Sequence, residues 1–295
     1  MSAYAQGDLS IRESLWDKIK DIDALETYVS SNSGTVEVTQ KEHAWVIDPI
    51  AAVTTQAGTV ELADTSYAAT NPTVLQNTTQ IIEYGFKVSK TNQNSDHAAF
   101  ESKFAREKVK KMKQWKNQLE LSAVIGTRAT ATGTAERKMD GMIRFASTLA
   151  TQKTTVTLTS DHLNTHLGDA WTAGAEHEVI LVGKALKNRI SGFTVGNTRN
   201  VDAEEAMLVG RVDVYDSDHG RVRIVKHRYI DSAAATAAVH AMTSYIPDYV
   251  SIGALDEVHY EDRPNAGYFM AGSVVGEYTV QVANEKAVSF IDGIV

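Results

Sequence analysis

The stretch SDHAAFESKFAREKVKKMKQWKNQLELSAVIG, residues 95–126, predicts the longest helix of this chain. Ser95 or Asp96 can cap its first turn, and Gly126 can end it. A helix over residues 95–125 has about eight turns and a length on the order of 45 Å, because each residue adds ~1.5 Å. We interpret an element of that length as a structural beam rather than as one wall of a small enzyme pocket.

The two sides of this predicted helix differ in chemistry. One side carries apolar residues at helical spacing, namely Phe100, Phe104, Val109, Met112, Trp115 and Leu119. The opposite side carries what we call the basic stripe, which is Lys103, Arg106, Lys110 and Lys113. Two interpretations of the stripe stay open: a solvated face, as charge runs usually are, or a contact with DNA or with an acidic protein surface.

An acidic arm precedes the helix in the sequence. Residues 1–35 read as an N-terminal arm with a short amphipathic helix from about Ser10 to Val29, which the loop at Ser30–Gly34 ends. The acidic residues of the arm could supply the negative partner of the basic stripe, and the candidates are Asp17, Asp21, Asp23 and Glu26.

Residues between the arm and the helix favour strands and turns. The alternation at Val36–Thr39 and the segment Ile81–Val88 each predict a strand. Thr54–Asn77 is polar and poor in large apolar side chains, so it cannot bury itself well. We expect a loop or an extended hairpin that lies on something else.

The residues that follow the long helix predict an α/β region. Ser160 or Asp161 begins a helix through Trp171, Val179–Val182 is a short buried strand, and a second helix follows from Lys184 to Phe193. Strands at residues 211–215 and 221–228 flank a turn that ends at Gly220. Residues 246–295 return to strand-like alternation.

Composition excludes several classes of protein. A formal net charge of −8 over 295 residues argues against a surface that grips nucleic acid everywhere, although one basic face stays compatible with it. The absence of cysteine excludes disulfides and thiolate metal sites. The N-terminal sequence MSAYAQGDLSIRESLW lacks the pattern of a signal peptide, and no apolar run reaches the ~18 residues of a membrane span.

Motifs that would carry chemistry fail on spacing or on partners. His162 and His166 stand four apart on a predicted helix, but no third ligand is near them, so we expect two solvated histidines. Asp213, Asp216 and Asp218 have the wrong spacing for a calcium loop and fit a turn better. The sequence therefore predicts no catalytic residue, no metal site and no cofactor.

Four groups of residues, in this order, carry a resemblance to a known family. EHAWVID at residues 42–48 and NTTQII at 77–82, with VSKT at 88–91, resemble the opening and the return strand of an extended loop. Residues 158–163, 171–174 and 187–193 resemble the start of an axial domain, and VDVYDSDHG at 212–220 resembles a hairpin there. From about residue 36 onward the chain resembles tailed-bacteriophage major capsid proteins with the Hong Kong 97-type fold, in a branch with a short N-terminus.

The resemblance implies an α+β architecture in five segments. These are an N-terminal arm (1–35), an extended β-hairpin loop (36–94), a peripheral domain (95–154) with a spine helix over 95–125, an inserted axial domain (155–245) and a return to the peripheral domain (246–295). It also leads us to expect contacts with neighbouring subunits or DNA at the stripe, at the arm acids, and at Trp45 and Asp48 of the loop.

The function that the resemblance implies is structural. The chain would self-assemble through pentamers and hexamers into an icosahedral shell around a double-stranded DNA genome, in a virion assembled in the host cytoplasm. Expected partners are copies of itself, separate scaffolding, portal and decoration proteins, and packaged DNA on the inner face, with no membrane. Two alternatives stay open: an encapsulin-like shell protein of a nanocompartment, and a soluble α/β enzyme centred on residues 155–245.

Overall fold

The computed structural model describes residues 25–50, 60, 61, 64, 70–95, 102–130, 135–193, 213–234, 239–264 and 267–295. The chain divides into two compact units. The described residues of the first unit fall within 83–115 and 259–275, and those of the second within 26–82, 116–258 and 276–295. The long helix and three long strands run through both units without interruption.

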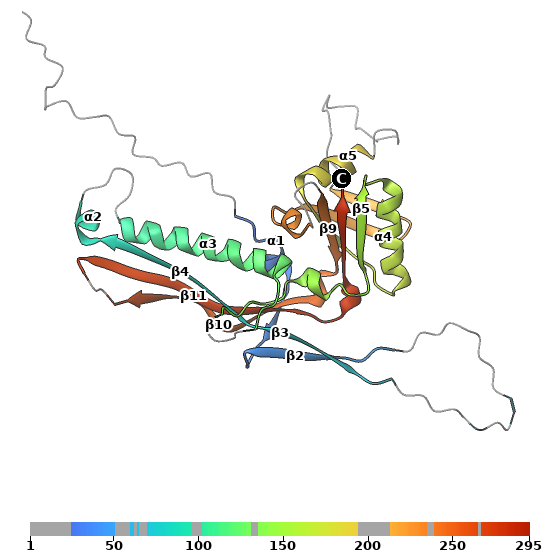
Figure 1. The fold of residues 1–295 in the computed structure, drawn as a ribbon, viewed down its shortest axis with the longest axis horizontal. Coiled ribbons are helices and arrows are strands. Elements are labelled where there is room, and N and C mark those ends of the chain that lie inside the picture. Colours follow the sequence, from blue (N-terminus) through green and yellow to red (C-terminus); the bar gives the residue numbers. More distant parts are fainter. Residues whose placement is uncertain are drawn as a thin grey trace, which may run out of the picture. The chain divides into compact units, whose positions relative to one another are not determined.

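A four-stranded sheet contains the longest strands (Figure 1). Its order is β1 (Gly34–Glu37), β10 (Val250–Arg263), β11 (Phe269–Val282) and β4 (Gln80–Ser89), with β1 parallel to β10. The strand expected at Ile81–Val88 is thus confirmed as β4, and the one expected at Val36–Thr39 begins and ends two residues earlier as β1.

Helix α3 (Lys103–Ile125) is the long helix expected from the sequence. In the first unit Phe104 packs on Phe86 of β4, with ring centres 4.9 Å apart, and Lys108 lies 4.0 Å over the ring of Tyr260. In the second unit Leu119, Ala123 and Val124 are buried. Phe104 and the side chain of Lys108 therefore cover the rings of Phe86 and Tyr260 on this sheet.

Two details of the expected long helix are wrong. Ser95 does not begin it, because Ser95 is the C-cap of the short helix α2 (Lys90–Asn94) and α3 begins at Lys103. Residues 96–101, including Phe100, lie outside the described part. Val109 was expected on the apolar side but is 57% exposed. The long run of helix formers hides this break, since helix propensity alone does not show where a chain turns.

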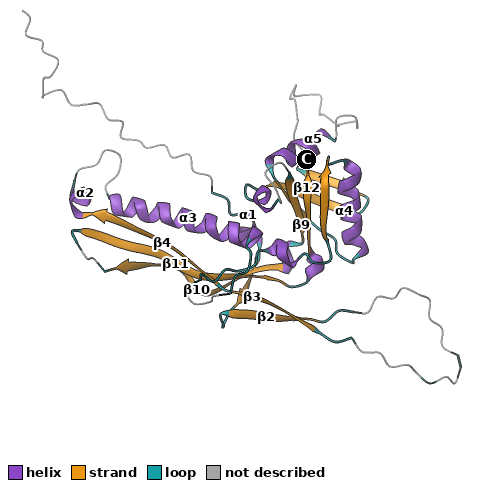
Figure 2. Ribbon diagram, viewed as in Figure 1, coloured by secondary structure: helices purple, strands orange, loops and turns teal. Residues whose placement is uncertain are grey.

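A six-stranded sheet forms most of the second unit, with two helices on it (Figure 2). Its order is β5 (Ala150–Val156), β12 (Val288–Ile294), β9 (His240–Tyr245), β6 (Val179–Val182), β8 (Gly220–Lys226) and β7 (Val214–Ser217). Helices α4 (Ser160–Thr172) and α5 (Lys184–Gly192) share its core, in which Leu163, Leu186 and Ile180 are fully buried. The last strand of the chain thus pairs with the region expected as the axial domain.

Local signals placed this α/β region well. The Thr159 side chain caps α4 by accepting a hydrogen bond from the His162 amide, and Gly174, at φ 90°, follows its end. Strands β7 and β8 form the expected hairpin, in which Gly220 takes φ 123°; Arg211 and Val212 lie outside the described residues. Short 3-10 helices η1 to η4 complete the elements, at Met142–Phe145, Ile230–Ala233, Pro247–Tyr249 and Glu285–Ala287.

A separate two-stranded sheet follows β1. Strand β2 (Glu42–Ile47) pairs antiparallel with β3 (Thr73–Thr78), and Val46 lies directly opposite Val74. The predicted segment 36–94 therefore holds strands of two different sheets, since β4 belongs to the four-stranded one.

The arm is described only from Leu25 onward. Helix α1 covers Tyr28–Asn32, so the expected end of a helix at Val29 and the expected loop at Ser30–Asn32 are wrong; residues 10–24 and the acids Asp17, Asp21 and Asp23 lie outside the described part. Among the described residues, no helix is both long and apolar enough to cross a membrane.

Candidate assembly site

Hydrogen bonds fasten the two-stranded sheet to its own subunit. The Trp45 indole donates to the Val282 carbonyl at 2.8 Å and lies 5.6 Å from the Phe145 ring. The Asn77 amide, fully buried, donates to the carbonyls of Val280 and Asp140 at 2.7 and 3.0 Å. Trp45 therefore packs inside its own subunit, which argues against the contact role expected for it.

An ion pair extends this attachment. Arg137 donates to the Thr79 carbonyl at 2.6 Å and pairs with Glu277 of β11. Arg128 donates to the Thr78 hydroxyl at 3.0 Å. Two guanidinium groups thus hold Thr78, the last residue of β3, and Thr79, which follows it, so the base of the loop has a defined geometry. Asp48, beyond the end of β2, is exposed.

At the spacing of a helix, the basic stripe falls on the side of α3 away from Phe104 and Trp115; Lys103, Arg106 and Lys110 are half-buried. The sequence argument overlooked Glu107, which lies 3.2 Å from the Lys103 ammonium and 3.8 Å from that of Lys110. Their side chains are between 23 and 39% exposed, and pairs that solvent screens in this way contribute only ~0.2–1 kcal/mol each. Lys113, at the end of the stripe, is exposed. Glu107 therefore offsets part of the positive charge of the stripe, which stays net positive.

A buried carboxylate joins three distant segments of the second unit. Glu120 of α3 is fully buried and accepts hydrogen bonds from the amides of Val29 and Ser30, at 2.7 and 2.8 Å, and contacts the His227 ring nitrogen at 3.1 Å. Burial alone would raise the pKa of Glu120, but the hydrogen bonds from His227, Ser30 and Val29 together hold that pKa below its ordinary value. We call Glu120, Val29, Ser30 and His227 the Glu120 junction.

The sequence argument missed this junction. The last turns of α3, from Leu121 to Ile125, contain no charged residue, whereas every earlier turn has at least one. A helix segment that is uncharged on all sides is usually buried. Glu120 is the last charge before that segment, and this is the signal that could have identified it.

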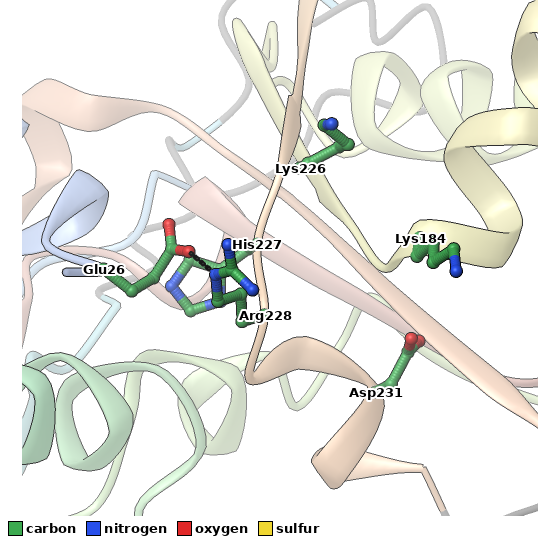
Figure 3. A pocket seen from close by; sticks show the side chains of 6 residues that line it. All are labelled: Glu26, Lys184, Lys226, His227, Arg228 and Asp231. Atoms are coloured by element: carbon green, nitrogen blue, oxygen red, sulfur yellow. Dashed lines mark ion pairs between the residues drawn. The ribbon is translucent and has the colours of Figure 1, made fainter. Parts of the chain in front are cut away.

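A charged pocket lies beside the junction (Figure 3). It has a volume of about 530 Å³, and Glu26, Lys184, Lys226, His227, Arg228 and Asp231 line it. Glu26 pairs with Arg228 at 3.5 Å, a different partner from the basic stripe that we expected for the arm acids. The Asp231 carboxylate sits so close to Gly183 that a Cβ there would meet it at 2.0 Å.

A second buried polar cluster lies between α4 and the six-stranded sheet. His166 and His177 both contact the hydroxyl of Ser244, at 3.0 and 2.6 Å, and Ser289 lies 2.5 Å from Ser244. We call these four residues the histidine–serine cluster. The expectation of two solvated histidines is wrong for His166, which is 5% exposed; His162 contacts Thr159 and the Thr157 carbonyl instead.

Within the described ranges, no three histidine, aspartate or glutamate side chains come together as a metal site. The histidine–serine cluster is buried, so no substrate could reach its hydroxyls. Asp216 and Asp218, for which the sequence favoured a turn over a calcium loop, lie in the β7–β8 hairpin.

Solved structures with the same fold come from phages and from a native GTA particle. A structure from Microbacterium phage Oxtober96 superposes with a TM-score of 0.66 at 11% identity, covering 96% of each chain. The capsid of Myoviridae phage XM1 gives 0.65 at 10% identity, covering 96% of this chain and 97% of that one. The capsid of a native GTA particle gives 0.64 at 11% identity, covering 99% and 98%. At these identities the likeness defines the fold class, which is that of phage major capsid proteins.

The family follows from the sequence itself. The chain belongs to the SU10 major capsid protein family, whose pattern matches residues 2–295. None of the curated protein sequences compared with the chain matches it significantly. The resemblance drawn from the sequence is therefore confirmed. The protein is a structural capsid subunit of a phage virion that associates with copies of itself, and this family membership excludes the enzyme alternative.

Proposed function

We propose that the chain assembles through pentamers and hexamers into a closed icosahedral shell around double-stranded DNA, in the host cytoplasm. The observation that carries this is the outer face of the two-stranded sheet, where Val46 and Val74 lie opposite one another and are each 64% exposed. An apolar pair on a firmly attached loop favours burial against another protein surface. In a shell, a neighbouring subunit provides that surface.

We also propose the five segments given above as the domains of the subunit. The two-stranded sheet supports an extended loop within 36–94, and α3 supports a spine helix within the peripheral domain. The six-stranded sheet supports an axial domain over 155–245, and strand β12 adds to it from the C-terminal segment. Scaffolding, portal and decoration proteins would then be separate chains.

Electron microscopy of the purified protein tests the proposed function. We expect closed particles with pentameric and hexameric capsomers, and nuclease-protected double-stranded DNA in particles taken from infected cells. Particles of small diameter that hold protein cargo and no DNA would instead favour the encapsulin-like alternative. A small soluble oligomer under all conditions would contradict the shell.

Removing the basic stripe is expected to lower particle yield and DNA content. In a variant with all four residues changed to Gln (Lys103, Arg106, Lys110 and Lys113), one helix face loses its positive charge, and the small contribution of each contact is multiplied over many subunits. The wild-type contacts should weaken with salt, because the screening length falls from ~10 Å at 0.1 M to ~3 Å at 1 M. Yield and packaged DNA are measured across ionic strength.

The matched control for the stripe exchanges Lys and Arg at the same four positions (Lys103→Arg, Arg106→Lys, Lys110→Arg and Lys113→Arg), which keeps the charge. It should assemble like the parent. If the Gln variant also assembles and packages like the parent at every salt concentration, the stripe is only a solvated face.

A further inference from the structure

The charged pocket beside the Glu120 junction lies at the carboxyl ends of two parallel strands. Strands β6 and β8 run parallel, with Val182 opposite Lys226, and helix α5 begins directly after β6, with Gly183 as its N-cap. Lys184 in the first turn of α5 and Lys226 at the end of β8 both line the pocket (Figure 3). In α/β sheets, ligands bind outside the carboxyl ends of parallel strands, and a helix N-terminus at that place favours an anion.

The charged pocket holds more positive charge than its carboxylates compensate. Glu26 is paired with Arg228 at 3.5 Å, and the carboxylate of Asp231 lies against the start of α5, where the helix dipole offsets its charge. Lys184 and Lys226 are exposed and have no ion-pair partner in the described part of the chain. Two ammonium groups of one cavity are therefore available to an anion.

A buried ring nitrogen of the charged pocket lacks a partner. His227 lines the pocket although it is only 2% exposed, and its Nδ1 forms no hydrogen bond with any of the described residues. A buried polar atom of this kind destabilises the fold unless a ligand, an ion or a water molecule satisfies it. The unpartnered nitrogen is thus a sign of a bound group that does not depend on the two lysines.

The other nitrogen of the His227 ring narrows the chemistry of that group. Glu120, whose pKa is held low, is ionised at neutral pH and can only accept, so His227 Nε2, 3.1 Å away, carries the ring proton. Nδ1 is then an acceptor in the neutral ring and a donor in the charged ring. Inorganic phosphate keeps one proton at neutral pH and also has bare oxygens, so it can pair with Nδ1 in either form. Sulfate has the same shape but no proton, and can pair with Nδ1 only in the charged form.

The size of the charged pocket favours a small molecule over DNA. Its volume of about 530 Å³ is within the ~300–1,000 Å³ of small-molecule sites. A rigid DNA duplex could touch the exposed lysines but could not enter the cavity. Its phosphodiesters also carry no proton at neutral pH, so they cannot donate to His227 Nδ1.

We propose that the charged pocket binds a small phosphate compound, with Lys184 and Lys226 paired to its oxygens at the N-terminus of α5 and His227 Nδ1 hydrogen-bonded to it. All these groups belong to one subunit, so the site needs no neighbouring copy and does not depend on the proposed shell. His227 also contacts Glu120, which holds Val29 and Ser30. A ligand that binds only the folded subunit therefore stabilises the Glu120 junction.

Isothermal titration calorimetry of the full-length, unassembled subunit with inorganic phosphate tests the site. Lys184→Gln combined with Lys226→Gln should lower the affinity for phosphate about tenfold or more, because the loss of even one charged hydrogen bond has that effect. Phosphate should raise the temperature of thermal unfolding of the parent but not of this variant. Sulfate should bind the parent more weakly than phosphate does, and a short DNA duplex should not displace phosphate.

The controls separate binding from folding and from total charge. Lys184→Arg with Lys226→Arg keeps the charges and should bind phosphate nearly as the parent does. Lys138→Gln with Lys286→Gln removes the same charge outside the pocket and should leave binding unchanged. Without phosphate, all variants should unfold at nearly the same temperature.

Four outcomes would each overturn the proposed site. These are no phosphate binding by the parent, equal binding by the Gln variant of the two pocket lysines, equal affinity for sulfate, and displacement of phosphate by duplex DNA. The proposed function is tested separately, since the formation of closed particles is measured by electron microscopy and not by phosphate binding.

Discussion

Replacing Glu120 with alanine is expected to lower the free energy of unfolding of the subunit by about 3–5 kcal/mol, the range for breaking a buried charged pair. The change removes the acceptor of two backbone amides, those of Val29 and Ser30, and the partner of the His227 ring; the contacts to Val29 and His227 are buried and the one to Ser30 is partly buried. A buried polar group that loses its hydrogen-bond partner destabilises the folded state by its full free energy of desolvation. Urea unfolding of unassembled subunits measures the change.

Glu107 provides the matched control, because it is a glutamate of the same helix that contacts two lysines near solvent. Glu107→Ala should change stability by less than about 1 kcal/mol. The effect of Glu120 should also depend on pH. Because its pKa is held below the ordinary 4.5, its ionised form stabilises the fold above pH 4.5, and this stability is lost as the pH falls through the lowered pKa. Equal effects of the two alanine variants would contradict the junction.

The elements that were predicted from the sequence are those with local signals. Helix α4 begins at Ser160, one of the two starts that the sequence predicted, and the structure adds Thr159 as its cap. The β7–β8 hairpin was predicted from its turn, which ends at Gly220, whose φ of 123° few other residues adopt. The end of α3 at Ile125 followed from apolar spacing and from Gly126, but its expected start at Ser95 or Asp96 lay several residues before Lys103. The break between α2 and α3 has no such signal, because Ser95 is as good a helix start as it is a helix end.

The features that were missed depend on partners far away in the sequence. Glu120 and His227 are 107 residues apart, and His166 meets Ser244 and Ser289 across 78 and 123 residues. A charged or imidazole side chain on a helix is usually solvated, so its local sequence points to the surface. Only the pairing of β9 with β12 brings the two serines together under α4, and no spacing rule predicts that pairing.

Trp171 illustrates the opposite error. As an apolar residue near the end of a predicted helix it fits a core position, yet the structure exposes it beside His219. Val46 and Val74 are similar, since alternation in β2 and β3 places one apolar side chain of each strand outward. In a subunit that associates with its own copies, an apolar residue in the sequence can be buried either inside the subunit or between subunits. The hydrophobic pattern of the sequence does not distinguish the two.

The histidine–serine cluster is expected to make the subunit less stable as the pH falls below about 6.5. Burial lowers the pKa of His177 from its ordinary value of 6.5, so the folded state favours the neutral ring. A histidine with a lowered folded pKa contributes its full stability above the unfolded value and loses it as the pH falls from there towards the folded pKa. Each pKa unit between the two states is worth about 1.4 kcal/mol.

The hydrogen-bond geometry gives a second reason why the subunit should lose stability as the pH falls. The Lys286 carbonyl, 3.1 Å from His177 Nε2, can only accept, so Nε2 carries the proton and the neutral ring accepts at Nδ1 from the Ser244 hydroxyl. The Ser289 hydroxyl can then donate to Ser244, and His166 Nε2 to Ser289 at 2.8 Å. A second proton on His177 would turn Nδ1 into a donor and force this whole chain of donors to reverse.

The measurement is urea unfolding of the subunit between pH 8 and pH 5, for the parent, His177→Gln and His162→Gln. The parent should lose stability steadily below pH 6.5. His177→Gln removes the titrating group, so it should start less stable at pH 8 and show a flatter pH dependence, whereas the surface change His162→Gln should leave the parent's slope intact. A His177→Gln variant with an unchanged slope would mean that other groups set the acid response, because a buried ring that no longer titrates cannot contribute to it.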